Sequence, residues 1–162
     1  MRLVLVRHAA AVARHSWPGD DAGRPLDERG RLQAAGLVGT LSAFGIAGLR
    51  SSPAVRCVAT LEPLAAAVAV PLETAGELFE GNGRRAIALV ASLLDGHGGP
   101  PPGAGDSVVL CSHGDVIPEV LEWFGAAGAD LGSDRRCQKG STWILERRRG
   151  GAVVGRYLPP PA

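Results

Sequence analysis

The segment Ser107-Val-Val-Leu-Cys-Ser-His113-Gly114 is the clearest buried strand of the sequence, and it runs directly into a histidine. A short unbroken apolar run is typical of a strand that is covered on both faces. The start of the chain, Leu3-Val-Leu-Val-Arg7-His8, follows the same plan. Because ligands bind at the carboxyl ends of parallel strands, we expect His8 and His113 to meet at that edge of a sheet.

The rest of the chain predicts helices that alternate with shorter strands. Ser52-Pro53 is the pattern of an N-cap followed by a first-turn proline, so it is expected to begin the second helix. The end of the chain reads as a hairpin around Arg149-Gly150-Gly151. The sequence therefore predicts an α/β fold, a three-layer sandwich with a mostly parallel central sheet. The expected helices are 27–44, 53–68, 84–94 and 116–124, and the expected additional strands are 48–51, 71–74, 142–146 and 152–157.

Length and charge limit the classes of protein. The 162 residues carry 17 basic and 16 acidic side chains and a net charge of +1. We expect one domain over 1–158 and a tail over 159–162, with an exposed, mobile loop at 96–105. The charge balance argues against nucleic-acid partners, and no apolar run suits a membrane span. Without a secretory signal pattern, and with three widely spaced cysteines, the chain is expected to be cytoplasmic.

Charged side chains cluster around the two strand ends. Arg7 precedes His8, and Arg56 falls in the first turn of the second expected helix, at the same edge of the sheet. Guanidinium groups pair with phosphate oxygens, so this set suits a phosphoryl group. One imidazole can attack phosphorus while the other donates to the oxygens. Glu80 is the carboxyl best placed to protonate a leaving group, and Glu77 competes with it.

Four blocks of the sequence, in the right order, resemble the histidine phosphatase superfamily, also called phosphoglycerate mutase-like. The short length, Ala9 in place of the family's glycine, and Lys139-Gly-Ser-Thr-Trp143 are most similar to the small bacterial phosphohistidine phosphatases. They are also similar to the phosphatase domain of actinobacterial mutator-type Nudix proteins. If the turn needed a positive φ, Ala9 would strain it. The four blocks are 3–11, 24–34, 51–60 and 112–117.

The resemblance implies a role for each matching residue. His8 would be the phosphorylated nucleophile, Arg7, Arg56 and His113 the phosphate pocket, and Glu80 the proton donor. Lys139 would bind substrate or only shape the following strand, and Arg14 and Arg24 would contact the substrate or solvent. No metal or cofactor is implied. The expected substrate is a phosphorylated small molecule, a nucleotide or a phosphohistidine protein, with a Nudix hydrolase as candidate partner. Two alternatives stay open: a non-catalytic phosphate-binding partner module and a phosphoglycerate mutase-type phosphotransferase.

Overall fold

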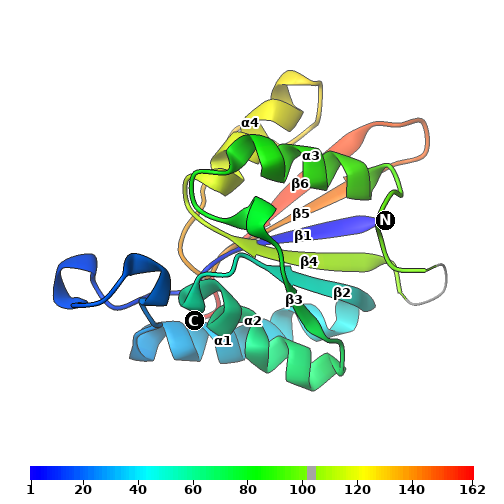
Figure 1. Ribbon diagram of the computed structural model, residues 1–162. Helices are drawn as coiled ribbons and strands as arrows, with labels where there is room; N and C mark the ends of the chain where they lie inside the picture. Colours follow the sequence, from blue (N-terminus) through cyan, green and yellow to red (C-terminus); the bar gives the residue numbers. More distant parts are fainter. Residues whose placement is uncertain (102–104) are drawn as a thin grey trace.

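Six strands form one sheet in the order β3-β2-β4-β1-β5-β6 in the computed structural model, which describes residues 1–101 and 105–162. Four strands are parallel, and β5 and β6 form an antiparallel hairpin at one edge (Figure 1). The predicted α/β sandwich with a mostly parallel sheet is confirmed. The strands are β1 (Arg2–Arg7), β2 (Ile46–Ser51), β3 (Leu72–Thr74), β4 (Ser107–Ser112), β5 (Thr142–Arg147) and β6 (Val153–Leu158).

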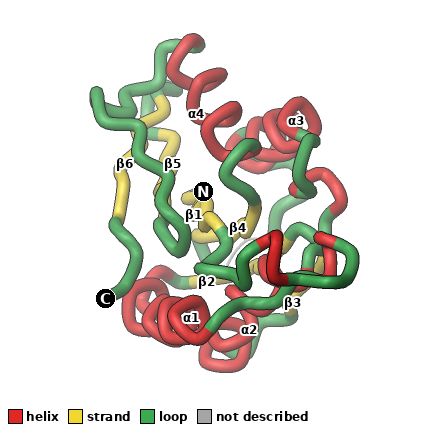
Figure 2. Tube along the Cα trace, turned by 90° about the vertical axis from the view of Figure 1, so that its left-hand side faces the viewer, coloured by secondary structure: helices red, strands yellow, loops and turns green. Residues whose placement is uncertain are grey.

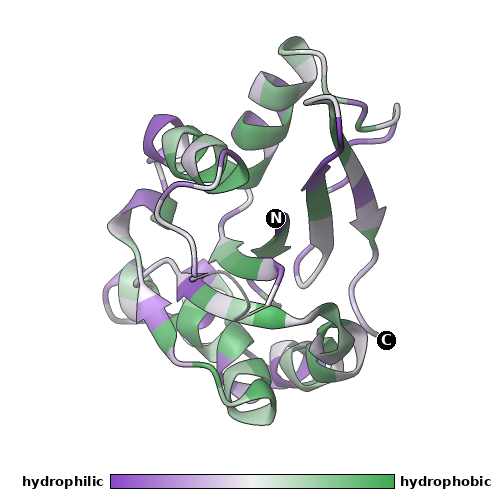
Figure 3. Ribbon diagram, turned by 90° about the vertical axis from the view of Figure 1, so that its right-hand side faces the viewer, coloured by the Kyte–Doolittle hydropathy of each residue, from purple (hydrophilic) through white to green (hydrophobic). Residues whose placement is uncertain are grey.

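Helices cover both faces of the sheet. The helices α1 (Glu28–Leu41) and α2 (Val55–Val68) lie on one face, and α3 (Gly83–Leu94) and α4 (Val116–Ala126) lie on the other (Figure 2). Successive residues of β1 serve opposite faces, as the pleat requires. Leu3 and Leu5 belong to the core under α3 and α4, whereas Val4 and Val6 belong to the core under α1 and α2. Figure 3 shows these hydrophobic strands between the two helical layers.

The first helix begins and ends close to the predicted positions. Asp27 caps it by accepting a hydrogen bond from Gly30 N at 2.7 Å. The last predicted turn, Ser42–Phe44, is 3₁₀ rather than α. Gly45 follows with φ 62°, a left-handed conformation that glycine adopts without steric cost. The α-helix thus ends at Leu41, three residues before the predicted end at Phe44, and Gly45 ends the 3₁₀ turn that follows it.

One predicted helix start is wrong. The helix α2 begins at Val55, and its N-cap residue, Ala54, makes no side-chain cap. The Ser52 hydroxyl lies instead against His113 in the site described below. Smaller differences are an earlier start of β2 at Ile46 and a later end of α4 at Ala126. The loop predicted at 96–105 includes residues 102–104, which lie outside the described residues. Among the helices of the described segments, none has the length and apolar character needed to cross a bilayer.

Candidate active site

The pairing of β1 with β4 brings His8 and His113 together. The register places Arg7 opposite Ser112, so the next residue of each strand is a histidine. The two imidazole centroids lie 5.5 Å apart with an interplanar angle of 67°. His8 is 5 % exposed and His113 1 % exposed. The two histidines that we expected to meet at the carboxyl edge of the sheet are therefore neighbours.

One ring nitrogen of His8 is engaged in a hydrogen bond. Its Nδ1 lies 2.9 Å from Ala9 O, and because a carbonyl only accepts, Nδ1 carries the proton and donates. The lone pair is then on Nε2. Burial lowers the pKa of His8 from 6.5 to about 3, and the positive charge of Arg56 acts in the same direction. His8 is thus a neutral imidazole with an unprotonated Nε2 at neutral pH.

The turn after His8 is fixed by two distant elements. Ala9 N donates to Thr60 Oγ1 at 2.9 Å, and Ala10 N donates to Gln33 Oε1 at 2.9 Å. The Thr60 hydroxyl in turn donates to Arg56 O at 2.7 Å. Ala9 is fully buried and does not have a positive φ. Alanine in place of the family's glycine therefore causes no left-handed strain at this turn.

Both predicted arginines lie beside the histidines, Arg56 buried and Arg7 half-buried. Arg7 donates through Nη1 to Cys137 O, and its guanidinium lies against the backbone of Gly114. Arg56 is 1 % exposed. In both side chains Nε is buried without a hydrogen-bond partner among the described residues. Each guanidinium therefore has one unsatisfied donor, which is costly in a protein interior.

Arg56 is also held by two carboxylates. Its Nη1 donates to Asp21 O at 2.8 Å, and its Nη2 lies 3.2 Å from Asp21 Oδ2 and 3.3 Å from Glu80 Oε2. Asp21 was not predicted as a site residue, because nothing in its loop sequence distinguishes it from a solvated carboxylate. Glu80 accepts from Arg14 as well, at 3.1 Å. Glu80 thus bridges the buried Arg56 and the exposed Arg14.

Ser52 determines how His113 is oriented. Arg56 Nη2 lies 3.3 Å from His113 Nδ1, and since a guanidinium only donates, Nδ1 is an acceptor here. The proton of neutral His113 is then on Nε2, which lies 2.8 Å from Ser52 Oγ. Sequence reasoning assigned Ser52 to a helix cap and missed this contact. The signal available was its place four residues before Arg56, as in the Ser-x-x-x-Arg pattern of the family that this block resembles.

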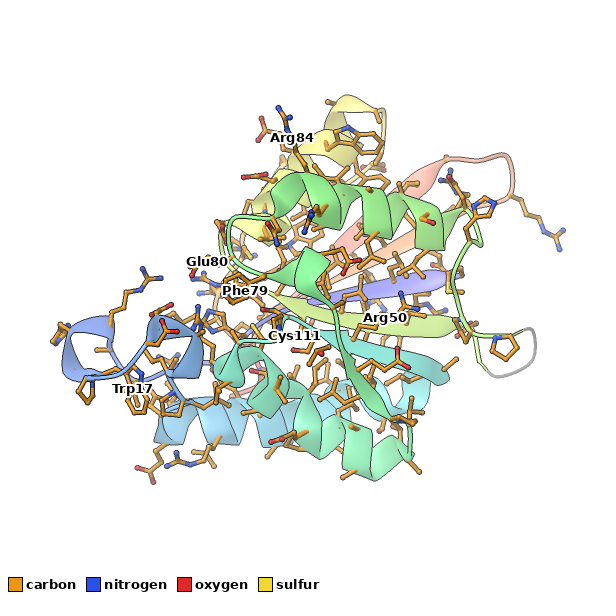
Figure 4. All side chains as sticks on the ribbon, in the orientation of Figure 1. Trp17, Arg50, Phe79, Glu80, Arg84 and Cys111 are labelled. Atoms are coloured by element: carbon orange, nitrogen blue, oxygen red, sulfur yellow. The ribbon has the colours of Figure 1, made fainter. Side chains whose placement is uncertain are left out.

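A cleft of about 360 Å³ opens above this cluster. Glu80 and Phe79 lie on the loop between β3 and α3, at the carboxyl end of the sheet (Figure 4). Glu77, the competing carboxylate, is exposed in the 3₁₀ turn Gly76–Leu78 and does not line the cleft. Asp115 lines the cleft and was not predicted. The lining residues are Arg7, His8, Ala13, Arg14, Arg24, Glu80, Gly114, Asp115 and Lys139.

The structure therefore gathers every residue predicted for the site. Lys139 lines the cleft, and the amide after it, Gly140 N, donates to both Arg7 O and His8 O at 3.1 Å. The remaining histidines, His15 and His97, are exposed and stand apart from the cleft lining.

The fold and the sequence together define the class of the protein. Residues 3–84 match the model of the histidine phosphatase superfamily (branch 1), so the chain belongs to this family. Its α/β fold is the phosphoglycerate mutase-like fold of its structural neighbours.

Three known proteins show the range of its similarities. The chain is 36 % identical over 164 residues to the 8-oxo-(d)GTP phosphatase of Mycolicibacterium smegmatis; the match covers 98 % of this chain and 48 % of that protein. The chain thus spans about half the length of this curated relative. The structure of protein histidine phosphatase SixA complexed with tungstate superposes with a TM-score of 0.69 at 20 % identity, covering 100 % and 97 % of the two chains. A mycobacterial glucosyl-3-phosphoglycerate phosphatase gives 0.71 at 18 % identity, with 99 % of each chain covered.

Proposed function

We propose that this chain hydrolyses a phosphomonoester or a phosphohistidine through a covalent phosphohistidine on His8. The observation that carries the proposal is the state of His8. Its Nδ1 is engaged with Ala9 O, and burial holds its pKa at about 3. A nucleophile must present a lone pair at working pH, and Nε2 meets this requirement.

The first step transfers the phosphoryl group to the enzyme. His8 Nε2 forms a bond to phosphorus while the bond from phosphorus to the leaving oxygen or nitrogen breaks. Arg7 and Arg56 pair with the phosphoryl oxygens through their guanidinium donors. Charge-assisted donors that are already in place stabilise the charge that develops in the transition state. His113, whose ring centroid lies 5.5 Å from that of His8, forms the wall of the pocket beside the nucleophile.

The second step returns the enzyme to its starting state. A water oxygen bonds to phosphorus, the bond between nitrogen and phosphorus breaks, and inorganic phosphate leaves. Glu80 is the proposed acid of the first step and the base of the second, because it lines the cleft next to Arg56. It gives a proton to the leaving group and recovers one from the water. The ion pair between Glu80 and Arg56 has to open before phosphoryl oxygens reach Arg56 Nη2.

The two other functions that the sequence left open receive less support. A phosphate-binding module needs cationic donors but no desolvated neutral histidine among them. A mutase returns the phosphoryl group to a second substrate, and nothing at the cleft favours transfer over release. Within the proposed hydrolysis, a phosphorylated small molecule, a nucleotide and a phosphohistidine protein are all candidate substrates. A Nudix hydrolase as partner stays a prediction from the resemblance.

Trapping the intermediate tests the proposal. Wild-type protein that is quenched in mid-turnover with a ³²P-labelled phosphomonoester should carry label in an alkali-stable, acid-labile linkage. His8→Asn should lose both the label and phosphate release. His97→Asn, which changes an exposed histidine, is the matched control and should retain both. Full phosphate release by His8→Asn would overturn the assignment.

A further inference from the structure

Gln33 is a buried amide that the two proposed steps do not use. It lies on α1 and is 4 % exposed. Its Oε1 accepts a hydrogen bond from Ala10 N at 2.9 Å, and its Nε2 donates to Lys139 O at 3.3 Å. Because a backbone N–H only donates and a carbonyl oxygen only accepts, these two partners require this orientation of the amide. Gln33 therefore joins the turn after His8 to the segment before β5.

The hydrogen bonds of Gln33 and His8 meet at one peptide group. Ala9 O accepts from His8 Nδ1, and Ala10 N, on the other side of the same C–N bond, donates to Gln33. The peptide bond between Ala9 and Ala10 is trans, so its C=O and N–H point in opposite directions within one rigid plane. Gln33 thus holds one end of the plane, and His8 is bonded to the other end.

The direction of the Ala9 carbonyl determines which nitrogen of His8 carries the proton. The tautomer of a neutral imidazole follows from the hydrogen bond that one of its nitrogens makes. With Ala9 O at 2.9 Å, Nδ1 keeps the proton and Nε2 keeps its lone pair. If the peptide plane turned, Nδ1 would lose its acceptor, and the tautomer with a proton on Nε2, which cannot attack phosphorus, would become populated. A group that prevents this rotation therefore maintains the nucleophile.

The same hydrogen bond also supports the charge that forms during the reaction. When Nε2 bonds to phosphorus, the His8 ring becomes cationic and its Nδ1–H becomes a stronger donor. Linked hydrogen bonds polarise one another, so a Gln33 oxygen at Ala10 N makes Ala9 O a better acceptor for that ring. Burial lowers the pKa of His8 to about 3, and the bond to Ala9 O acts in the opposite direction. The bond thus offsets part of the cost of forming a buried cation.

Gln33 has little freedom to move away from this peptide group. A Cβ atom placed on Gly140 would lie 3.0 Å from Gln33 Cδ, so a side chain at this position would crowd the amide. Gly140 N donates to His8 O at 3.1 Å. At the start of α1, Asp27 N donates to Ala10 O at 3.1 Å. The amide is therefore enclosed by two segments, each of which is bonded to the backbone at 8–10.

On the basis of the proposed function, we propose that Gln33 is a positioning residue for the nucleophile: through the peptide group of Ala9 and Ala10 it keeps the proton of His8 on Nδ1 and leaves Nε2 free to attack phosphorus. Gln33 lies outside the residues that line the cleft, so it acts through the peptide group and not on the substrate. A catalytic base or nucleophile is often oriented by a third group. Here that group is a peptide carbonyl, and Gln33 fixes its direction. The bond to Ala10 N carries this role, whereas the bond to Lys139 O holds the amide in place.

Substitutions of Gln33 separate its two hydrogen bonds. Gln33→Leu and Gln33→Met remove both, and kcat/KM for a phosphomonoester should fall by about 10- to 10²-fold because the nucleophile loses its alignment. Gln33→Glu keeps an oxygen for Ala10 N, whereas its carboxylate cannot donate to Lys139 O, so this variant should retain most of the activity. The control is Leu37→Ala, one turn further along α1 in the core, which destabilises the helix without touching the turn after His8 and should keep the wild-type kcat/KM. An equal loss in Gln33→Leu and Gln33→Glu would contradict the role of the bond to Ala10 N.

Nitrogen chemical shifts of the His8 ring report the tautomer directly. Wild type, Gln33→Glu and Leu37→Ala should show a protonated Nδ1 and an unprotonated Nε2 at neutral pH. In Gln33→Leu both shifts should move toward those of a tautomer mixture, and unchanged shifts in this variant would overturn the proposal. If wild type forms no phosphohistidine but Gln33→Leu still changes the shifts, the proposed hydrolysis fails and the positioning of His8 stands. Melting temperatures confirm that each variant is folded.

Discussion

The guanidinium of Arg7 rests directly on the backbone of Gly114: a Cβ atom placed on Gly114 would lie 2.6 Å from Arg7 Cζ. Gly114 has no positive φ, so its backbone conformation does not require glycine. What requires glycine is the close approach of an arginine whose other side is held by Cys137 O. The His-Gly pair after β4 therefore serves two purposes. His113 supplies an imidazole to the site, and Gly114, which has no side chain, leaves space for the Arg7 guanidinium.

Gly114→Ala should displace the Arg7 guanidinium without unfolding the chain. A displacement of about 1 Å in a phosphate-binding group can reduce activity by about 10²-fold, and a reduction of this size in kcat/KM is expected. Gly76→Ala is the control, because a Cβ there meets no atom within 4 Å and φ is not positive. Steady-state kinetics and melting curves of both variants check the prediction. Wild-type kcat/KM in folded Gly114→Ala would contradict it.

Glu80→Gln tests the proposed proton donor. General acid catalysis typically contributes about 10²- to 10⁴-fold, and the contribution is largest when the leaving group is a poor one. The kcat/KM for an alkyl phosphate, which reports the first step alone, should therefore fall by at least about 10²-fold, whereas the kcat/KM for p-nitrophenyl phosphate should fall far less. Glu77→Gln, at the exposed competing carboxylate, should affect neither substrate. An equal loss for the two leaving groups would assign Glu80 to binding instead.

Ser52→Ala should disturb His113 while the rest of the site stays in place. It removes the acceptor of a ring N–H that is 1 % exposed, and an unsatisfied buried donor costs about 1–3 kcal/mol of unfolding free energy. The activity should also change, because the Nε2–H of His113 loses its acceptor and the orientation of the ring is no longer fixed. Nitrogen chemical shifts of the His113 ring and the pH profile of kcat report this change. Ser51→Ala, another buried hydroxyl, should lower stability but leave both readouts as in wild type.

The meeting of His8 and His113 was predictable because it depends only on two strands that are apolar, parallel and adjacent. Strand type follows from local composition, and the carboxyl ends of parallel strands share an edge. Arg56 was predictable for a similar reason, since the start of a helix that follows such a strand lies at the same edge. These inferences needed the order of the elements but no detail of side-chain packing.

The roles of Ser52 and Asp21 could not be predicted in this way. Ser52 precedes a proline, and that local pattern favours a helix cap; its actual partner, His113, is 61 residues away. Asp21 meets Arg56 across 35 residues, and a loop carboxylate has no local mark that distinguishes a buried ion pair from solvation. In both cases a tertiary contact overrides the local preference. The partner that a buried polar side chain bonds depends on which distant segment of the chain packs against it in the folded protein.

The buried neutral state of His8 should make the fold sensitive to acid. Its pKa falls from 6.5 to about 3 in the folded protein, so between these values the unfolded chain binds a proton that the folded chain does not. The contribution of neutral His8 to the free energy of unfolding is fully present above about pH 6.5. It is lost as the pH falls, by at most about 1.4 kcal/mol per pH unit. His8→Asn should reduce the slope of unfolding free energy against pH in this window, as measured by urea titration. His97→Asn should keep the wild-type slope.

Two glycines of α1 should respond in opposite directions to the same substitution. A Cβ on Gly30 would lie 1.8 Å from Ala10 O, in the turn that follows His8, whereas a Cβ on Gly39 meets nothing within 4 Å. Gly39→Ala should stabilise the fold by about 0.5–1 kcal/mol, because alanine loses less backbone freedom in a helix. Gly30→Ala should cost at least about 1–3 kcal/mol, since the helix and the turn must move apart. That movement should also lower kcat/KM, because Ala10 and His8 share the turn. Chemical denaturation and kinetics on the two variants test both effects, and equal stability changes would contradict the close approach of α1 to the active-site turn.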